Sequence, residues 1–356
     1  MPVTVRSFAK INFGLRIGAL RGDGFHELRT VYQTIALHDL IHVDVRRGSG
    51  IEILCSDPRV PTGEANTCYR IVELAMTALR ARGRVVISIE KRLPVQGGLG
   101  GASGNAVAAL LGLERALKKQ LAWGQKLRLA AEVGSDLPLF LIGGTVLGVA
   151  RGEEVFPLPD LPAVPCVVAV PEVGVSTPRA FADWDSSRRG ASTLACEPAE
   201  SRSTWAGLRP APTQPVASQS KLTVAHPSDR MIELGRDMAV WLSGLAEQKS
   251  KVYSGVSAMG RGRAETLLLD LVRTGIENDF EQVVFPKYSE LREAKRVLER
   301  AGARYASLSG SGSALYGLFA SHRAAQKAAA VLGQRGIRAL ATTTLTRPQY
   351  WKKIFA

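Results

Sequence analysis

Residues 94–106 read Pro-Val-Gln-Gly-Gly-Leu-Gly-Gly-Ala-Ser-Gly-Asn-Ala and lead directly into 107–117, a stretch rich in Ala and Leu with helical spacing. Four of the five residues 97–101 are glycine, which is more than a tight packing turn requires. Successive glycines let backbone N–H groups converge, and the start of a helix adds about half a positive charge. The stretch therefore predicts a phosphate-binding loop, although it is neither a Walker A loop nor a G-x-G-x-x-G turn after a strand.

The composition indicates a folded protein with anionic partners. The chain has 356 residues, which corresponds to about two domains of ordinary size. Hydrophobic residues make up 46% and charged residues 22%, which excludes disorder as the overall state. The 46 Lys and Arg against 32 Asp and Glu give a net charge of +14. This excess favours phosphorylated small molecules, nucleic acid or an acidic membrane surface as partners.

The cysteines and the N-terminus indicate an ordinary reducing compartment. Cys55, Cys68, Cys166 and Cys196 are scattered and form no C-x-x-C pair. A disulfide framework, a zinc ribbon and a thioredoxin motif are therefore excluded. The first residues lack the apolar core of a signal peptide, and no run approaches the roughly 18 apolar residues of a membrane-spanning helix. We expect a bacterial-type cytoplasmic location.

Hydrophobic spacing gives a coarse order of elements. Strand-like runs occur at 2–8, 11–17, 31–37, 41–46, 51–54, 85–89, 144–150, 315–319 and 337–345. Helical spacing occurs at 67–82, 107–117, 124–132, 229–247, 264–275, 287–301 and 321–335. The last of these runs follow the order β-α-β, as in split βαβ units.

The composition changes after residue 186. Residues 187–230 are dense in Ser, Pro, Thr, Ala and Arg and show little periodicity. We expect a mobile loop at about 187–225 within a longer insertion at 187–263. The expected domains are 1–160, which carries the Gly-rich loop, and 161–356, which carries the insertion.

Three motifs together resemble those of the GHMP kinases, a superfamily that includes galactokinase, homoserine kinase and mevalonate kinase. They are 94–106, Ala-Lys-Ile-Asn-Phe-Gly-Leu at 9–15, and Ser-Gly-Ser-Gly-Ser-Ala at 309–314. Asp-Gly-Phe-His-Glu-Leu at 23–28 is similar to the D-G-Y-H-x-L signature of one branch, which phosphorylates 4-diphosphocytidyl-2-C-methyl-D-erythritol. Val-Ser-Thr at 175–177, Phe181 and Asn-Asp-Phe-Glu at 278–281 also fit this branch. The resemblance covers about 1–185 and 265–345.

The resemblance implies an α+β architecture, the two-domain GHMP kinase fold, with the site in the cleft between the domains. The N-terminal domain would resemble the α/β fold of ribosomal proteins and translation factors, and the C-terminal domain would be ferredoxin-like. The implied reaction is ATP-dependent, Mg²⁺-assisted phosphorylation of the substrate 2-hydroxyl in the non-mevalonate (methylerythritol phosphate) isoprenoid pathway. We expect a small-molecule partner, no nucleic acid, no membrane, and a monomer or homodimer.

By the same resemblance, Lys10 and Asp136 are the catalytic residues. Residues 134–140 read Gly-Ser-Asp-Leu-Pro-Leu-Phe and match the family's G-x-D-x-P-x-F pattern. Asp136 would accept the proton of the substrate hydroxyl or orient that hydroxyl, with Lys10 beside it. Judged from the residues alone, Asp136 can equally be a helix N-cap and Lys10 an exposed strand lysine.

The substrate contacts implied by the resemblance are Asn12, Phe25, His26, Thr177 and Phe181. Phe25 and His26 would contact the cytosine, and Phe181 would be the opposite jaw. Phe25 stands where the family has Tyr, so stacking is kept and a phenol hydrogen bond is lost. An apolar core position is the competing interpretation of Phe181.

The predicted nucleotide contacts are the residues of the Gly-rich loop: Pro94, Val95, Gln96, Gly97, Gly98, Leu99, Gly100, Gly101, Ala102, Ser103 and Gly104. The nucleotide would carry Mg²⁺, with the Ser103 hydroxyl as the candidate protein ligand. The 309–314 motif is expected to turn beside this loop, or to be a purely structural hairpin. His38 and His42 lie four apart, but a strand would separate them, so no metal pair is expected.

Three other functions remain open at this point. One is a different GHMP small-molecule kinase. Another is a nucleic-acid-binding module, which the charge permits but the 6% aromatic content does not favour. The third is a catalytically inactive relative, which the presence of Lys10, Asp136 and the Gly-rich loop disfavours.

Overall fold

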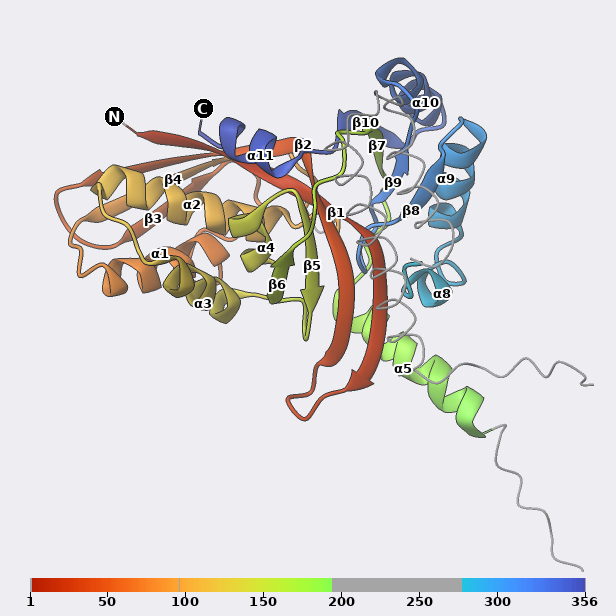
Figure 1. The fold of residues 1–356 in the computed structure, drawn as a ribbon, viewed down its shortest axis with the longest axis horizontal. Coiled ribbons are helices and arrows are strands. Elements are labelled where there is room, and N and C mark those ends of the chain that lie inside the picture. Colours follow the sequence, from red (N-terminus) through yellow and green to blue (C-terminus); the bar gives the residue numbers. More distant parts are fainter. Residues whose placement is uncertain (1, 96, 194–276, 356) are drawn as a thin grey trace, which may run out of the picture.

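The protein, seen in a computed structural model that describes residues 2–95, 97–193 and 277–355, is built on two sheets (Figure 1). The first sheet has six strands in the order β3-β4-β2-β5-β6, with β1 paired to β2. Its strands are β1 (Val3–Leu20), β2 (His26–Arg46), β3 (Ile51–Cys55), β4 (Arg84–Glu90), β5 (Thr145–Val149) and β6 (Glu154–Pro157). The antiparallel β1–β2 hairpin extends from this sheet towards the second one.

The β1–β2 hairpin is longer than the sequence pattern predicts. The expected pairs of short strands at 2–8 and 11–17, and at 31–37 and 41–46, are each one continuous strand. The separation seen in the pattern corresponds instead to register shifts between Phe8 and Ala9 and between Asn12 and Gly14. Such bulges bend a strand and re-aim its side chains without ending it. They flank Lys10, one of the predicted catalytic residues.

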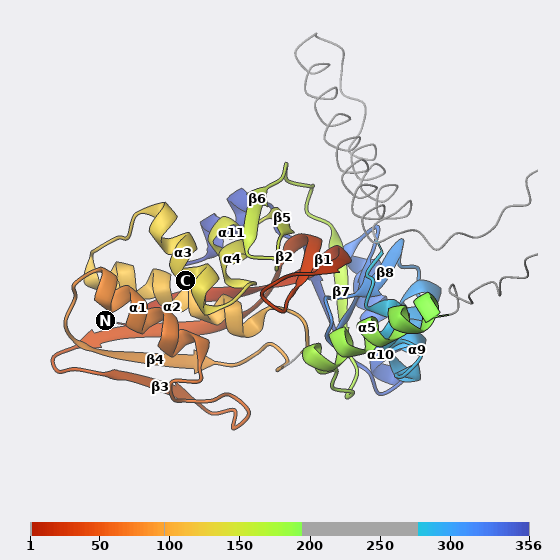
Figure 2. The ribbon, with the colours of Figure 1, turned by 90° about the horizontal axis from the view of Figure 1, so that it is seen from below.

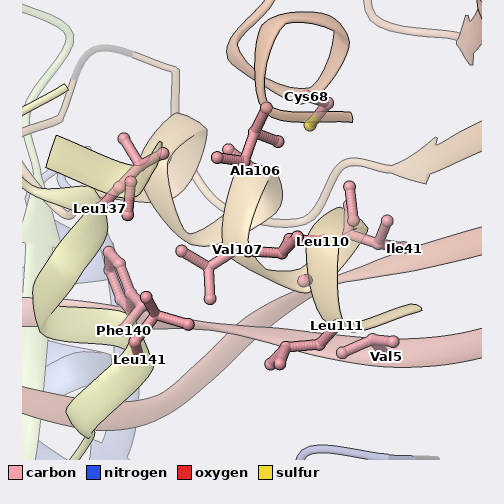
Figure 3. Packing of buried hydrophobic residues seen from close by; sticks show 14 of the residues in the cluster. Val5, Ile41, Cys68, Ala106, Val107, Leu110, Leu111, Leu137, Phe140 and Leu141 are labelled. Atoms are coloured by element: carbon pink, nitrogen blue, oxygen red, sulfur yellow. The ribbon is translucent and has the colours of Figure 1, made fainter. Parts of the chain in front are cut away.

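Helices cover one face of the first sheet (Figure 2). They are α1 (Thr67–Ala78), α2 (Gly101–Leu117), α3 (Trp123–Val133) and α4 (Leu137–Ile142). Helix α2 is the central one, and most of its residues from Gly104 to Glu114 are buried. In Figure 3, Leu110 and Leu111 of α2 lie near Ile41 and Val5 of the sheet, and Phe140 of α4 packs nearby. The Ala and Leu pattern that predicts this helix is therefore also the pattern of the core.

The second sheet has the strand order β10-β7-β9-β8. Its strands are β7 (Pro165–Val170), β8 (Tyr305–Leu308), β9 (Leu315–Leu318) and β10 (Arg338–Thr343). The helices that accompany it are α5 (Thr177–Thr193), α8 (Glu281–Val284), α9 (Ser289–Arg300) and α10 (His322–Gln334). Its core includes Trp184, Phe280 and Phe319, all at most 2% exposed.

The chain then returns to the first sheet. Thr344 forms a bridge with Ile35, and Phe355 forms one with Val5. Between them, helix α11 (Arg347–Lys353) buries Tyr350 in the core of the first sheet. The last residues therefore pack with the N-terminal half, and the division at residue 160 stays a prediction.

The structure confirms the strands expected at 51–54, 85–89, 144–150, 315–319 and 337–345, to within a few residues at their ends. It likewise confirms the helices expected at 67–82, 124–132, 287–301 and 321–335. The helix expected at 107–117 is present but begins at Gly101, so residues 101–106 of the expected loop are its first turns. The short elements α4, β6, β7, β8, α8 and α11 were not expected, because four to seven residues carry too little periodicity to be recognised.

Residues 187–193, expected to begin a loop, are the end of α5. The rest of the expected insertion, with its helix at 229–247, lies outside the described residues, and so does the helix expected at 264–275. Within the described ranges, no helix is both long and apolar enough to cross a membrane.

The packing of α2 on the sheet gives a test of this architecture. At Gly112, an added Cβ would lie 2.7 Å from Val43 Cγ2 of β2. Gly112→Ala should therefore destabilise the fold by about 1–3 kcal/mol through overpacking, measured by urea denaturation. Gly124→Ala on α3 is the matched control: its Cβ would meet nothing within 4 Å, and helix propensity favours alanine. Equal stability of the two variants would contradict the packing described here.

Candidate active site

A cavity of about 720 Å³ lies where the β1–β2 hairpin, the Gly-rich loop, α5 and the 309–314 motif meet. All the predicted catalytic and substrate-binding residues line it: Lys10, Asn12, Phe25, His26, Asp136, Thr177 and Phe181. Of the predicted nucleotide-binding residues, Gly98, Gly100 and Ser103 line it as well. The lining does not include Pro94, Val95, Gly97, Leu99, Gly101, Ala102 or Gly104, and Gln96 lies outside the described residues.

Lys10 and Asp136 form an ion pair at the centre of this cavity. Lys10 Nζ lies 3.3 Å from Asp136 Oδ2; the lysine side chain is 4% exposed and that of the aspartate 33%. Asp136 occupies the N-cap position of α4, but its side chain makes no capping hydrogen bond. The competing N-cap interpretation thus explains the position of Asp136 in the chain and not the direction of its carboxylate. A buried ammonium in contact with a partly open carboxylate can hydrogen-bond an alcohol that lies beside the pair.

Asn12 holds Lys10 in place. Lys10 Nζ donates to Asn12 Oδ1 at 2.8 Å, and Asn12 Nδ2 donates to Thr30 Oγ1 at 2.7 Å. Thr30 in turn donates to the carbonyl of Gly14 at 2.7 Å. Both ends of the Asn12 amide therefore form hydrogen bonds within the protein. Asn12 positions the Lys10 ammonium.

Tyr32 is a site residue that the sequence analysis missed. Its hydroxyl donates to Asp136 Oδ1 at 3.1 Å, and Lys10 Nζ lies 5.4 Å from the centre of its ring. Burial, with a further contribution from the Asp136 carboxylate, raises the pKa of Tyr32 well above its ordinary value, so the hydroxyl stays a donor. An aromatic residue in a predicted strand looks like core, and only the pairing of distant segments shows that its hydroxyl reaches the site.

The Gly-rich loop and the 309–314 motif touch backbone to backbone. Ala314 N donates to Gly97 O at 3.1 Å, and Ser309 Oγ donates to Gly98 O at 3.1 Å. A Cβ on Gly98 would lie 2.3 Å from Ser309 O, and one on Gly312 would lie 2.5 Å from Gly98 N. These glycines are needed because no side chain fits between the two loops.

Helix α2 begins at this contact. Its N-cap is Gly100, with φ +69° and no side chain to cap the helix, and its first turn holds no acidic residue. The first N–H groups of the helix are therefore available to an anion, and Ser103 of the same turn faces the cavity. Leu99 anchors the loop: it is 2% exposed, and its carbonyl accepts from Lys10 N at 2.9 Å. This end of the cavity fits the phosphates of a nucleotide.

The described residues contain no cluster of three or more His, Cys, Asp or Glu that could hold a metal ion. His38 and His42, both in β2, have different hydrogen-bond partners: His38 Nδ1 contacts Ala36 O at 2.8 Å, and His42 Nδ1 contacts Thr4 Oγ1 at 2.9 Å. A cation bound mainly by phosphate oxygens needs few protein ligands, and Ser103 is a suitable one. The residues present thus fit Mg²⁺ carried by a nucleotide and do not form a metal cage.

At the aromatic end of the cavity, His26 and Phe181 are in direct contact. His26 and Phe181 do not face one another across a gap; their rings stack with centroids 5.3 Å apart and planes 6° apart. Phe25 is 52% exposed at the cavity mouth. A planar base can therefore lie against Phe25 or the outer face of this stack, but not between His26 and Phe181. The role of Phe181 as a jaw stays a prediction.

Both ring nitrogens of His26 face polar atoms of the protein. Nδ1 lies 3.2 Å from Gly18 O, and Nε2 lies 3.0 Å from Asp185 Oδ1 of α5. The imidazole ring is therefore held between the β1–β2 hairpin and α5.

Two further motif residues connect the site to the second sheet. Thr177 Oγ1 lies 2.7 Å from Ser311 Oγ, which ties the start of α5 to the 309–314 motif. Asn278 Nδ2 donates to Gly310 O at 2.7 Å and to Leu308 O at 2.9 Å. Asn278 therefore fixes the shape of the motif from behind rather than contacting a ligand.

Comparison with known proteins places this geometry in a family. The family models "GHMP kinases N terminal domain" and "GHMP kinases C terminal" match residues 66–144 and 261–338. A crystal structure of 4-(cytidine 5'-diphospho)-2C-methyl-D-erythritol kinase superposes with a TM-score of 0.64 and 27% identity, covering 96% of this chain and 98% of that one. A mevalonate kinase structure superposes with a TM-score of 0.62 over 97% of this chain and 99% of its own, at 10% identity, and so shares the fold.

Curated relatives are closer in sequence. The 4-diphosphocytidyl-2-C-methyl-D-erythritol kinase of Solibacter usitatus (strain Ellin6076) is 35% identical over 331 residues, 93% of this chain and 85% of the relative. The enzyme of that name from Synechococcus sp. (strain JA-2-3B'a(2-13)) is 33% identical over 328 residues, 91% of this chain and 88% of its own. The chain therefore belongs to the 4-diphosphocytidyl-2-C-methyl-D-erythritol kinase family of the GHMP kinases.

Proposed function

We propose that this chain transfers the γ-phosphate of ATP to the 2-hydroxyl of 4-diphosphocytidyl-2-C-methyl-D-erythritol, a step of isoprenoid synthesis. The observation that carries the proposal is the Lys10–Asp136 pair, 3.3 Å apart, in a cavity with an anion-binding loop and an aromatic pocket. The curated relatives named above carry the same activity in their names, at up to 35% identity. The geometry of the active site and the activity of the family therefore support the same reaction.

The glycine-rich end would bind the triphosphate of ATP. The N–H groups at the start of α2 can donate to phosphate oxygens, and the helix dipole favours their charge. The 309–314 motif keeps the loop in this shape through the contacts at Gly97 and Gly98. Mg²⁺ bound to the nucleotide, with Ser103 as the protein residue that would help to hold it, supplies neutralisation of phosphate charge.

At the centre, Asp136 would accept a hydrogen bond from the substrate 2-hydroxyl. It would take the proton of that hydroxyl as the new P–O bond forms and the bond between the γ-phosphorus and the β–γ bridging oxygen breaks, with ADP as the leaving group. Tyr32 occupies Oδ1 and Lys10 lies next to Oδ2, so the carboxylate is held in one orientation. The Lys10 ammonium can also stabilise negative charge on the transferred group. Since phosphoryl transfer needs mainly positioning and electrostatic stabilisation, this small set of residues is sufficient on the protein side.

At the other end, Phe25 and the His26–Phe181 stack would hold the cytosine. His26, which lines the same end of the cavity, would then hydrogen-bond the edge of the base, as the family resemblance implies. Thr177 stands between this region and the 309–314 motif, in reach of the sugar or phosphate part of a ligand.

The finer parts of the fold and the cellular setting belong to the same proposal. The connectivity β7-α5, β8-β9-α10-β10 and the order β10-β7-β9-β8 support a ferredoxin-like second domain. The likeness of the first domain to ribosomal proteins rests on the family resemblance. We further propose a cytoplasmic enzyme that acts on a small molecule.

The function is tested by ADP release from ATP and Mg²⁺ with a panel of acceptors. We expect turnover with 4-diphosphocytidyl-2-C-methyl-D-erythritol and none above background with mevalonate, homoserine or galactose, because only the first offers a base to the aromatic end. Phosphorus NMR of the product should show one new phosphomonoester. A folded protein that phosphorylates another acceptor instead would show that this chain is a different GHMP kinase.

Removal of the Asp136 carboxylate should abolish catalysis without weakening the binding of ATP. Asp136→Asn keeps the size of the side chain and removes the proton acceptor, which is expected to lower kcat by at least about 100-fold. ATP affinity, measured by calorimetry, should stay within about twofold. Arg84→Gln, which changes a surface ion pair with Glu52 at the edge of the first sheet, is the control. Near-normal kcat in Asp136→Asn would exclude the assigned role.

Tyr32→Phe removes one hydroxyl and keeps the ring that packs in the site. Loss of the hydrogen bond to Asp136 should lower kcat by about tenfold, and the KM values should change little, because Tyr32 orients the carboxylate. The kinetic split is the readout, with thermal unfolding to show that the fold is intact. A rise in KM with unchanged kcat would instead make Tyr32 a ligand contact.

A further inference from the structure

A second cavity lies on the half of the molecule that holds the first sheet, between the end of α2, the start of α3 and helix α11. Its volume is about 550 Å³, which is within the range of sites for small molecules. It shares no lining residue with the active-site cavity, and the mechanism above uses none of its side chains. The two cavities are therefore separate.

Aromatic side chains form one wall of this second cavity. The ring centres of Trp123 and Trp351 are 6.3 Å apart, with the ring planes at 57°. Trp351 is held in place, because its Nε1 donates to Ile142 O at 3.0 Å and its ring packs edge-on against Tyr350. Trp123 is 45% exposed, whereas tryptophan is mostly buried in folded proteins. An exposed indole in the wall of a cavity offers a stacking surface to a planar ring.

Positive charge gathers at the rim of the second cavity. Arg115 lies in the last turn of α2, Lys118 is the C-cap of that helix, and both residues are exposed. The guanidinium carbon of Arg115 lies 4.4 Å from the centre of the Phe355 ring, so a cation–π contact holds it beside the cavity. In the part of the chain that the structure describes, neither Arg115 nor Lys118 has a carboxylate partner. Their two charges exceed the roughly half negative charge that the end of α2 contributes.

The third cation of the second cavity is neutralised. Lys126 Nζ of α3 donates to Glu114 Oε2 of α2 at 2.7 Å, and these side chains are 9% and 5% exposed. Glu114 Oε1 accepts from Leu121 N at 2.7 Å. Among the described residues that line the cavity, Glu114 is the only acidic one. The charges of Arg115 and Lys118 therefore remain for a ligand.

We propose that the second cavity binds a planar aromatic phosphate, the class of compound to which nucleoside monophosphates belong. The ring would stack on Trp123, and the phosphate would lie at Arg115 and Lys118. A phosphate dianion matches the two positive charges, and a planar guanidinium can donate to two of its oxygens. A carboxylate, with its single charge, would leave one cation unpaired. The site is separate from the ATP site, and binding to it does not depend on the proposed reaction.

Calorimetry with matched probes tests the two parts of this site. The wild-type protein should bind AMP at least about tenfold more tightly than adenosine, which lacks the charge, or ribose 5-phosphate, which lacks the ring. Arg115→Gln combined with Lys118→Gln should lower the affinity for AMP by at least about tenfold and leave that for adenosine unchanged. Trp123→Ala should lower both affinities by about fivefold or more, because the stacking surface is lost.

The control removes two exposed cations that do not line the cavity. Lys119→Gln combined with Arg128→Gln changes the net charge by the same amount on the same two helices, and should leave AMP binding as in the wild type. Thermal unfolding shows that each variant is folded. AMP affinity that is equal in the wild type and the cavity variants would place AMP in the active site alone and overturn the proposal. Absence of saturable binding of both AMP and GMP to the wild type would overturn it as well.

Discussion

The close contact between two glycine loops is the constraint on which the rest of the site depends. Gly98 lies so close to Ser309 and Gly312 that no side chain could stand at either glycine. One loop begins helix α2 over the first sheet, and the other connects β8 to β9 in the second sheet. This contact joins the two sheets at the point where a triphosphate would be held. The charged, hydroxyl and aromatic side chains of the cavity are then placed at fixed positions relative to that triphosphate.

The chemistry needs few charged groups because the backbone supplies much of the electrostatics. The start of α2 presents N–H groups, and Lys10 is buried to 4% exposure with its ammonium held by Asn12 and Asp136. A buried ammonium is stable only when it is paired and hydrogen-bonded, and here both conditions are met. The net charge of +14 belongs to the chain as a whole and explains little of the site.

The sequence was sufficient to predict those parts of the site that lie within short continuous segments. The glycines at 97–101, the Lys10–Asn12 segment and the Asp136 segment each carry their chemistry within a few residues, and the structure brings them into one cavity. Tyr32 could not be predicted in the same way, because its partner Asp136 is 104 positions away and the contact depends on how β2 lies relative to the start of α4. Likewise, the direct stacking of His26 on Phe181 depends on where α5 docks against the hairpin, a matter of tertiary packing.

The return of the chain to its starting sheet has a mechanical consequence. Arg6 N donates to Ile354 O at 2.7 Å, so both ends of the described chain are fastened to one half of the molecule. The second sheet is entered at Pro165 and left at Thr343, and is thus suspended from the first by two covalent connections instead of one. Two points of attachment permit rotation about the line that joins them and restrict movement in other directions. An opening of the cleft is therefore expected to be a rotation about the axis that these two connections define.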